Sequence, residues 1–94
     1  MVSEKKTPAF ELGMILITRN AFYTLKPEDV SHWLFRHSQG QWGMCSSDDA
    51  HENDLALANG HRLLSVYCDS NGTKFWIITE ADRSVTTVLL PEDY

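Results

Sequence analysis

The residues with the best types and spacing for chemistry form a polar group near the C-terminus: Glu80, Asp82, Arg83 and Ser84. A nuclease can use a glutamate such as Glu80 as general base, and an arginine such as Arg83 to stabilise charge on phosphorus. A structural role also fits, because Glu80 and Arg83 can pair across a bend while Asp82 accepts hydrogen bonds from backbone N–H groups. The net charge of −5 disfavours an RNA substrate, so we predict the structural role and keep catalysis by Glu80 and Arg83 as the alternative.

A second candidate is a binding surface formed by a tryptophan and the acidic segment that follows it. From residue 37 to residue 61 the chain has no Lys or Arg. The candidate contact residues are Trp42, Asp48, Asp49 and Glu52. Tryptophan often anchors interfaces, and an acidic rim attracts a basic partner. The alternatives are that Trp42 packs into the core over the junction of two helices, and that the acids form a solvated helix face.

The sequence indicates neither a metal site nor a cofactor. The soft or borderline metal ligands Cys45, His51, His61 and Cys68 are separated by five, nine and six residues. Zinc sites have short paired spacings instead. A glycine-rich phosphate loop and a GxSxG nucleophile motif are both missing from the sequence. We therefore expect no metal and no cofactor.

Length and composition predict one small globular domain. The chain has 94 residues, of which 43% are hydrophobic and 22% charged, which is enough for a single core. It shows no secretory signal and no apolar run of about 20 residues, so we expect a cytoplasmic protein with reduced cysteines and no membrane contact. The acidic charge disfavours direct nucleic-acid binding and suits a basic protein partner.

The predicted elements begin after a flexible N-terminal arm, residues 1–9, and one domain spans residues 10–94. The apolar run at residues 13–18 (GMILIT) predicts a buried strand. Two helices are expected next. The first begins at Pro27 and ends near Gly40, and the second begins at Ser46 or Ser47 and ends near Ala58.

The C-terminal third predicts a meander of three strands at residues 63–68, 74–80 and 84–90. Residues alternate between apolar and polar in this part of the chain, and strong turn signals separate the three runs. The order of elements predicts an α+β fold. We expect a four-stranded, mainly antiparallel sheet in which the first strand joins the C-terminal meander, with the helices on one face.

The segment from Trp76 to Tyr94 (WIITEADRSVTTVLLPEDY), with Gln41–Trp42–Gly43, residues 53–57 and residues 62–67, resembles a small bacterial family encoded on plasmids and integrative elements. The resemblance covers roughly the last 55–60 residues of the chain. The family has no established activity, so the resemblance implies no reaction and transfers no catalytic residue. A mobile-element setting implies host interaction, plasmid maintenance or counter-defence.

These observations together predict a small non-enzymatic protein-binding module. It would act on a host protein as an inhibitor or accessory factor, through the tryptophan and acidic surface defined above. The alternative is a barnase-like ribonuclease or toxin-type enzyme that uses Glu80 and Arg83. A homodimer formed by pairing of an exposed sheet edge with itself is a third hypothesis.

Overall fold

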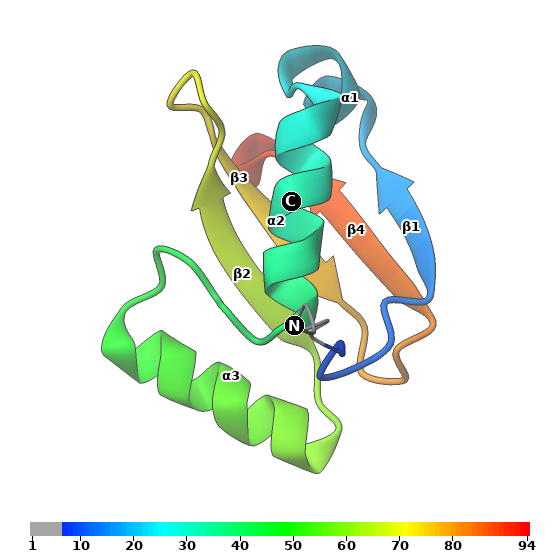
Figure 1. The fold of residues 1–94 in the computed structure, drawn as a ribbon, viewed down its shortest axis with the longest axis vertical. Helices are drawn as coiled ribbons and strands as arrows, with labels where there is room; N and C mark the ends of the chain where they lie inside the picture. The colour runs from blue at the N-terminus through cyan, green and yellow to red at the C-terminus, as the bar shows by residue number, and fades with distance from the viewer. Residues whose placement is uncertain (1–6) are drawn as a thin grey trace, which may run out of the picture.

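One four-stranded sheet organises the computed structural model, which describes residues 7–94. Its strands are β1 (Met14–Ile17), β2 (Leu63–Cys68), β3 (Lys74–Thr79) and β4 (Val85–Leu89). They lie in the order β1-β4-β3-β2, as Figure 1 shows. The α+β class and the four-stranded sheet expected from the sequence are confirmed.

Three α-helices lie between β1 and β2. They are α1 (Arg19–Thr24), α2 (Pro27–Ser38) and α3 (Ser47–Asn59), and a 3-10 helix, Pro91–Asp93, closes the chain. Pro27 begins α2 as predicted, and the Ser46 side chain caps α3 by accepting a hydrogen bond of 3.1 Å from the Asp49 N–H. Helix α1 was not predicted as a helix. Thr18 caps it by accepting a hydrogen bond from the Ala21 N–H.

The sheet is mixed, which corrects the expected mainly antiparallel arrangement. Strand β1 pairs with β4 in parallel, whereas β2–β3 and β3–β4 are antiparallel. The path of the chain explains this. Helix α2 crosses the sheet and returns the chain to the end where β1 began, so β2 runs in the direction of β1 (Figure 1). The two hairpins that follow reverse the chain twice, so β4 also runs in the direction of β1, and it lies beside β1 in the sheet.

The main core lies between α2 and one face of the sheet. Its buried residues are Ala21, Leu25, Tyr67, Phe75, Ile77, Val88 and Leu90, against which Val30, Trp33 and Leu34 pack. The strand register brings Tyr67 opposite Phe75 and Ile77 opposite Val88 on this face. The Trp33 ring stacks on the Tyr67 ring with 4.5 Å between centroids, and Val30, Trp33 and Leu34 form the apolar stripe by which α2 faces the core.

Helix α3 does not lie on that face with α2, which corrects the expectation that the helices share one face. It lies beside β2 instead (Figure 1), and with residues 42–44 it covers the outer edge of this strand. The Val66 N–H donates to the Trp42 carbonyl at 3.1 Å, and the Met44 N–H donates to the Val66 carbonyl at 2.7 Å. Gly43 permits this approach, because its φ is 78° and a Cβ there would overlap the Val66 carbonyl oxygen.

The N-terminal segment leads into β1. Residues 1–6 of the expected arm lie outside the described residues, and residues 7–9 are bonded to the end of α2. The Ala9 N–H donates to the Ser38 carbonyl at 2.7 Å, and the Gln39 side chain donates to the Thr7 carbonyl at 3.1 Å. Strand β1 is exposed along its whole length, not buried as expected, because it is an edge strand of the sheet. No helix within residues 7–94 has the length and apolar character to span a membrane.

Candidate functional site

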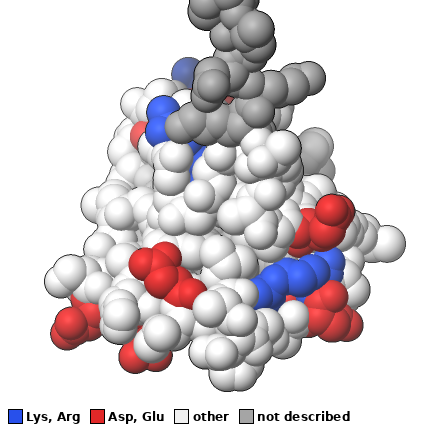
Figure 2. Space-filling view, turned by 60° about the horizontal axis from the view of Figure 1, so that its bottom comes forward, with Lys and Arg blue, Asp and Glu red and all other residues white. Residues whose placement is uncertain are grey.

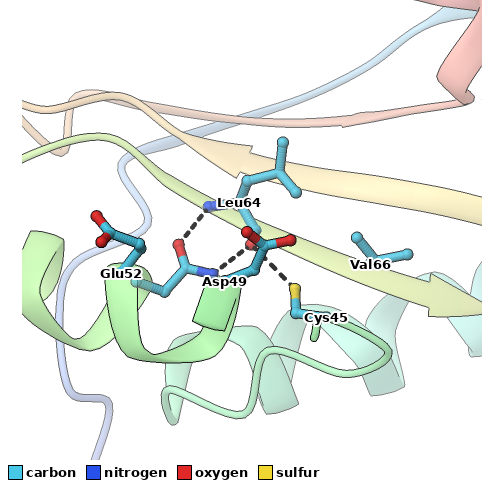
Figure 3. A pocket seen from close by; sticks show the side chains of 6 residues that line it. Cys45, Asp49, Glu52, Leu64 and Val66 are labelled. Atoms are coloured by element: carbon cyan, nitrogen blue, oxygen red, sulfur yellow. Dashed lines mark hydrogen bonds between the residues drawn. The ribbon is translucent and has the colours of Figure 1, made fainter. Parts of the chain in front are cut away.

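The candidate site is a hollow between α3 and β2, and a single asparagine sets the distance between these elements. The Asn53 side chain donates to the Leu64 carbonyl at 2.8 Å and accepts from the Leu64 N–H at 3.1 Å (Figure 3). One amide therefore satisfies both main-chain groups that Leu64 presents at the sheet edge. Asn53 is only 8% exposed, so it fixes α3 to β2 from the inside.

The hollow has an apolar floor and an acidic rim. It has a volume of about 320 Å³ and is lined by Cys45, Asp49, Glu52, Asn53, Leu64 and Val66. Leu64 and Val66 come from β2 and are half-buried, whereas Asp49 and Glu52 come from α3 and are exposed (Figure 3). This combination fits a side chain with an apolar stem and a positive end, which describes Lys or Arg.

The thiol that borders the hollow is not activated. Burial raises the pKa of Cys45, and the negative charge of Asp49 raises it further. Its Sγ lies 3.3 Å from the Trp42 carbonyl oxygen. Cys45 and Cys68 are both free cysteines, and Cys68 Sγ lies 3.4 Å from the sulfur of Met44. The hollow thus offers binding surface, not a thiolate nucleophile.

The structure separates the four predicted contact residues into two groups. Asp48, Asp49 and Glu52 are exposed on the first turns of α3, with Asp49 and Glu52 at the hollow. Trp42 is 5% exposed, and its indole N–H donates to the Asp54 carboxylate at 2.9 Å. Its position is the alternative stated above, a core tryptophan at the helix junction. The contact role of these residues stays a prediction. Of the four, only the three acids are exposed enough to touch a partner protein.

The surface around the hollow is unevenly charged. Figure 2 shows the side of the molecule that lies at the bottom of Figure 1, where α3 is placed. Acidic side chains occur at several separate places on this side, whereas basic side chains are confined to its right and upper-left parts. Among the residues of this face that the structure describes, the basic side chains form no continuous stripe of the kind that tracks a nucleic-acid backbone.

The polar group at residues 80–84 holds the turn between β3 and β4. Arg83 has a φ of 63°, and its guanidinium donates to the main-chain carbonyls of His61 at 2.6 Å and Glu80 at 3.1 Å. Asp82 accepts from the N–H and the hydroxyl of Ser84 at 3.0 and 2.6 Å, which lowers the pKa of Asp82. Arg83 thus bonds to the main-chain carbonyl of Glu80, whereas the prediction paired it with the Glu80 carboxylate. Both terminal nitrogens of its guanidinium donate to main-chain carbonyls.

A buried polar chain beneath α2 was not predicted. The His37 ring has 0% exposure, and its Nδ1 lies 2.6 Å from Ser65 Oγ while its Nε2 lies 2.8 Å from Thr79 Oγ1. Thr79 Oγ1 lies 2.7 Å from Thr86 Oγ1, whose hydroxyl donates to the Leu12 carbonyl at 2.7 Å. The sequence signal was the placement of His37 on the apolar stripe of its helix together with hydroxyl residues in the strands.

The last acceptor of this hydrogen-bond chain, the Leu12 carbonyl, determines which group donates at each step. The carbonyl of Leu12 only accepts, so the Thr86 hydroxyl donates to it and accepts from Thr79. Thr79 Oγ1 in turn accepts from Nε2–H of His37. Burial lowers the pKa of His37 to about 3, and the positive charge of Arg83 adds to this effect. The ring is therefore neutral, and its Nδ1 accepts from the Ser65 hydroxyl.

The Ser65–His37 pair resembles half of a nucleophilic triad, but a substrate has no access to it because both residues have 0% exposure. We therefore assign these residues a structural role. Among residues 7–94, no cluster of three or more His, Cys, Asp or Glu side chains is arranged to hold a metal ion.

Comparison with models of known protein families, with curated proteins and with solved structures finds no significant match to this chain.

Proposed function

We propose that this protein is a small, non-enzymatic protein-binding module that holds a basic segment of a partner protein against α3. The observation that carries this proposal is the hollow of about 320 Å³ whose floor is apolar and whose rim carries Asp49 and Glu52. Its two edges are different elements held together by Asn53, so the hollow is a fixed feature and not a gap between mobile segments.

The proposed contact uses two kinds of interaction. The stem of a Lys or Arg packs on Leu64 and Val66, while its charged end lies between the carboxylates of Asp49 and Glu52. Asp48, one position before, extends the negative potential and attracts the basic segment during encounter. The net charge of −5 acts in the same direction at longer range.

The partner that we propose is a host protein. This part of the proposal rests on the resemblance of the Trp76–Tyr94 segment to proteins encoded on plasmids and other mobile elements. Such elements benefit from small proteins that inhibit or modify a host factor, including one used for defence. An inhibitor or accessory factor needs a stable binding surface and no catalytic residues, which agrees with the engaged state of the Arg83 side chain.

The test begins with capture of partners from a bacterial lysate by the tagged protein, with and without nuclease treatment. A captured protein that survives nuclease is then purified and titrated against the wild-type chain by calorimetry. The decisive variant is the triple substitution Asp48→Ala, Asp49→Ala and Glu52→Ala, which removes three carboxylates from α3. We expect its affinity to fall by about tenfold or more, mainly through slower association.

A charge-matched control separates the local site from the overall charge. The substitutions Glu28→Ala, Glu80→Ala and Glu92→Ala change the net charge by the same amount, at exposed positions outside α3. This control should bind within about threefold of wild type, since distant exposed charges are screened. Equal losses in both triple variants, or no loss in either, would show that α3 does not hold the partner.

A further inference from the structure

The edge of the sheet at β1 is apolar and exposed. All four residues of the strand, Met14–Ile17, have side chains that are 37–63% exposed. On α1, which begins two residues after the strand, the aromatic side chains of Phe22 and Tyr23 are exposed as well. Monomeric proteins usually protect such an edge with a charge, a proline or a bulge, and residues 12–18 contain none of the charged residues or prolines that do this.

The main chain of β1 is also open on its outer side. The Met14 N–H donates to the Ser84 carbonyl at 2.8 Å, and the Thr18 N–H donates to the Val88 carbonyl at 3.0 Å. Alternate residues of a strand point their main-chain groups to opposite sides, so Ile15 and Ile17 direct their N–H and C=O groups away from β4. Within residues 7–94, no strand or loop accepts or supplies these hydrogen bonds.

The opposite edge of the same sheet is treated differently. There, Asn53 bonds both main-chain groups of Leu64, and residues 42–44 bond Val66. Residues 7–94 thus cover the β2 edge with their own atoms and leave the β1 edge uncovered (Figure 1). The difference indicates that β1 pairs with a strand from outside the chain.

We propose that this strand is β1 of a second copy, paired antiparallel to form a two-fold dimer with a continuous sheet of eight strands. The charges at the two ends of β1 are what point to a second copy. Glu11 precedes the strand and Arg19 follows it, and both are exposed. Antiparallel pairing places Glu11 of each copy beside Arg19 of the other, whereas parallel pairing would bring like charges together. At the Arg19 end of the strand, the carboxylate of Asp93 accepts hydrogen bonds from the side chains of Thr18 and Asn20.

The surface beside β1 can accommodate the partner's side chains. Ile17 borders an apolar hollow of about 200 Å³ with Phe22, Leu25, Pro27, Val30 and Ser31. The strand register puts Ile15 and Ile17 on the same face as Thr86 and Val88, the face that α2 covers. Side chains of the second copy would therefore cover Ile15 and Ile17 on one side, while Met14 and Leu16 meet their counterparts on the other.

The oligomeric state of the full chain tests the proposal. We expect sedimentation equilibrium from micromolar concentration upward to show a reversible monomer–dimer equilibrium. The substitution Ile17→Pro removes an outward N–H while leaving the hydrogen bonds to β4 in place, and should weaken dimerisation by tenfold or more. Ile15→Lys should do the same by adding a charge at the edge. Leu55→Lys on α3 is the control, since Leu55 is 45% exposed and Ile15 43%, and it should dimerise like wild type.

A charge exchange tests the direction of pairing. Glu11→Lys should weaken the dimer about threefold, and the double variant Glu11→Lys with Arg19→Glu should restore it. Circular dichroism establishes that each variant is folded, and Ile15→Lys replaces Ile17→Pro if the proline variant is not. A chain that is monomeric at every concentration would overturn the proposal, as would a dimer that survives both edge substitutions. A dimer that Glu11→Lys does not weaken would overturn its antiparallel geometry, because parallel pairing places like charges together both before and after the substitution.

Discussion

The buried imidazole of His37 makes the stability of the fold depend on pH in a calculable way. The folded protein holds this ring neutral, with a pKa of about 3, whereas the ordinary value is 6.5. Below about pH 6.5 the unfolded chain gains a proton that the folded chain does not, so acid favours unfolding. The stability is therefore complete above the unfolded pKa and falls as the pH decreases from about 6.5 towards 3.

The size of the effect follows from the two pKa values. Each pH unit below the unfolded value costs about 1.4 kcal/mol as long as the folded ring stays neutral. At pH 5 the free energy of unfolding should therefore be about 2 kcal/mol lower than at pH 7.5. The aspartates with lowered pKa, Asp29, Asp82 and Asp93, have an ordinary value of 3.8 and contribute their own losses only at lower pH. Of the groups whose pKa is shifted, His37 is therefore the one that changes stability between pH 7.5 and 5.

Urea denaturation followed by tryptophan fluorescence at several pH values measures this loss. In His37→Gln the loss between pH 7.5 and 5 should disappear, although the variant is less stable at every pH because its fit to Ser65 and Thr79 is poorer. His32→Gln, an exposed histidine on the same helix, should keep the full pH dependence.

NMR titration of the wild-type ring gives an independent measurement if the glutamine variant does not fold. The His37 resonances should not titrate between pH 7.5 and 4.5, and the Nε2-protonated tautomer should be present throughout. A ring that titrates near pH 6.5 in the folded protein would refute the reasoning, and so would a stability that is the same at pH 7.5 and 5.

Three further substitutions probe the contacts that position the candidate site. Gly43→Ala should lower the free energy of unfolding by about 2 kcal/mol or more, because the new Cβ would overlap the Val66 carbonyl at a positive φ; a change under about 0.5 kcal/mol in urea denaturation would contradict this. Asn53→Ala should cost about 2–3 kcal/mol, since Leu64 loses both main-chain partners, and hydrogen exchange should become faster at Leu64 first. Arg83→Lys should cost about 1–2 kcal/mol because one ammonium cannot replace a guanidinium that donates to several carbonyls, and an unchanged melting temperature would count against that role.

The local elements were predictable because their signals are carried by neighbouring residues. Pro27 and Ser46 mark helix starts, and the alternation from residue 63 to 68 marks a strand. The parallel pairing of β1 was missed because it depends on the direction of every intervening element. The buried face of β2 was hard to identify for a related reason. It carries Ser65, a polar residue that is buried only because His37 on α2 meets it.

The candidate site was predicted in part. The acids of α3 lie at its rim, as their clustering suggested, but the hollow itself depends on how Asn53 meets Leu64 across a gap of 11 positions in the chain. Trp42 was a candidate contact residue because tryptophan often anchors interfaces, and packing in the core was the alternative. Gly43 lets the chain follow the β2 edge, and the indole lies in the interior beside Asp54.

The pairing of the first strand with the last has a consequence for the order of folding. Strand β1 is synthesised early, yet its only partner within the described chain is β4, and the Thr18 hydroxyl bonds a carboxylate, that of Asp93, 75 positions later. During translation the MILI segment therefore stays unpaired until β4 has left the ribosome. Contacts so distant in sequence slow folding and leave an apolar strand accessible meanwhile. The nascent chain is thus most prone to aggregation in the interval between the emergence of β1 and that of β4.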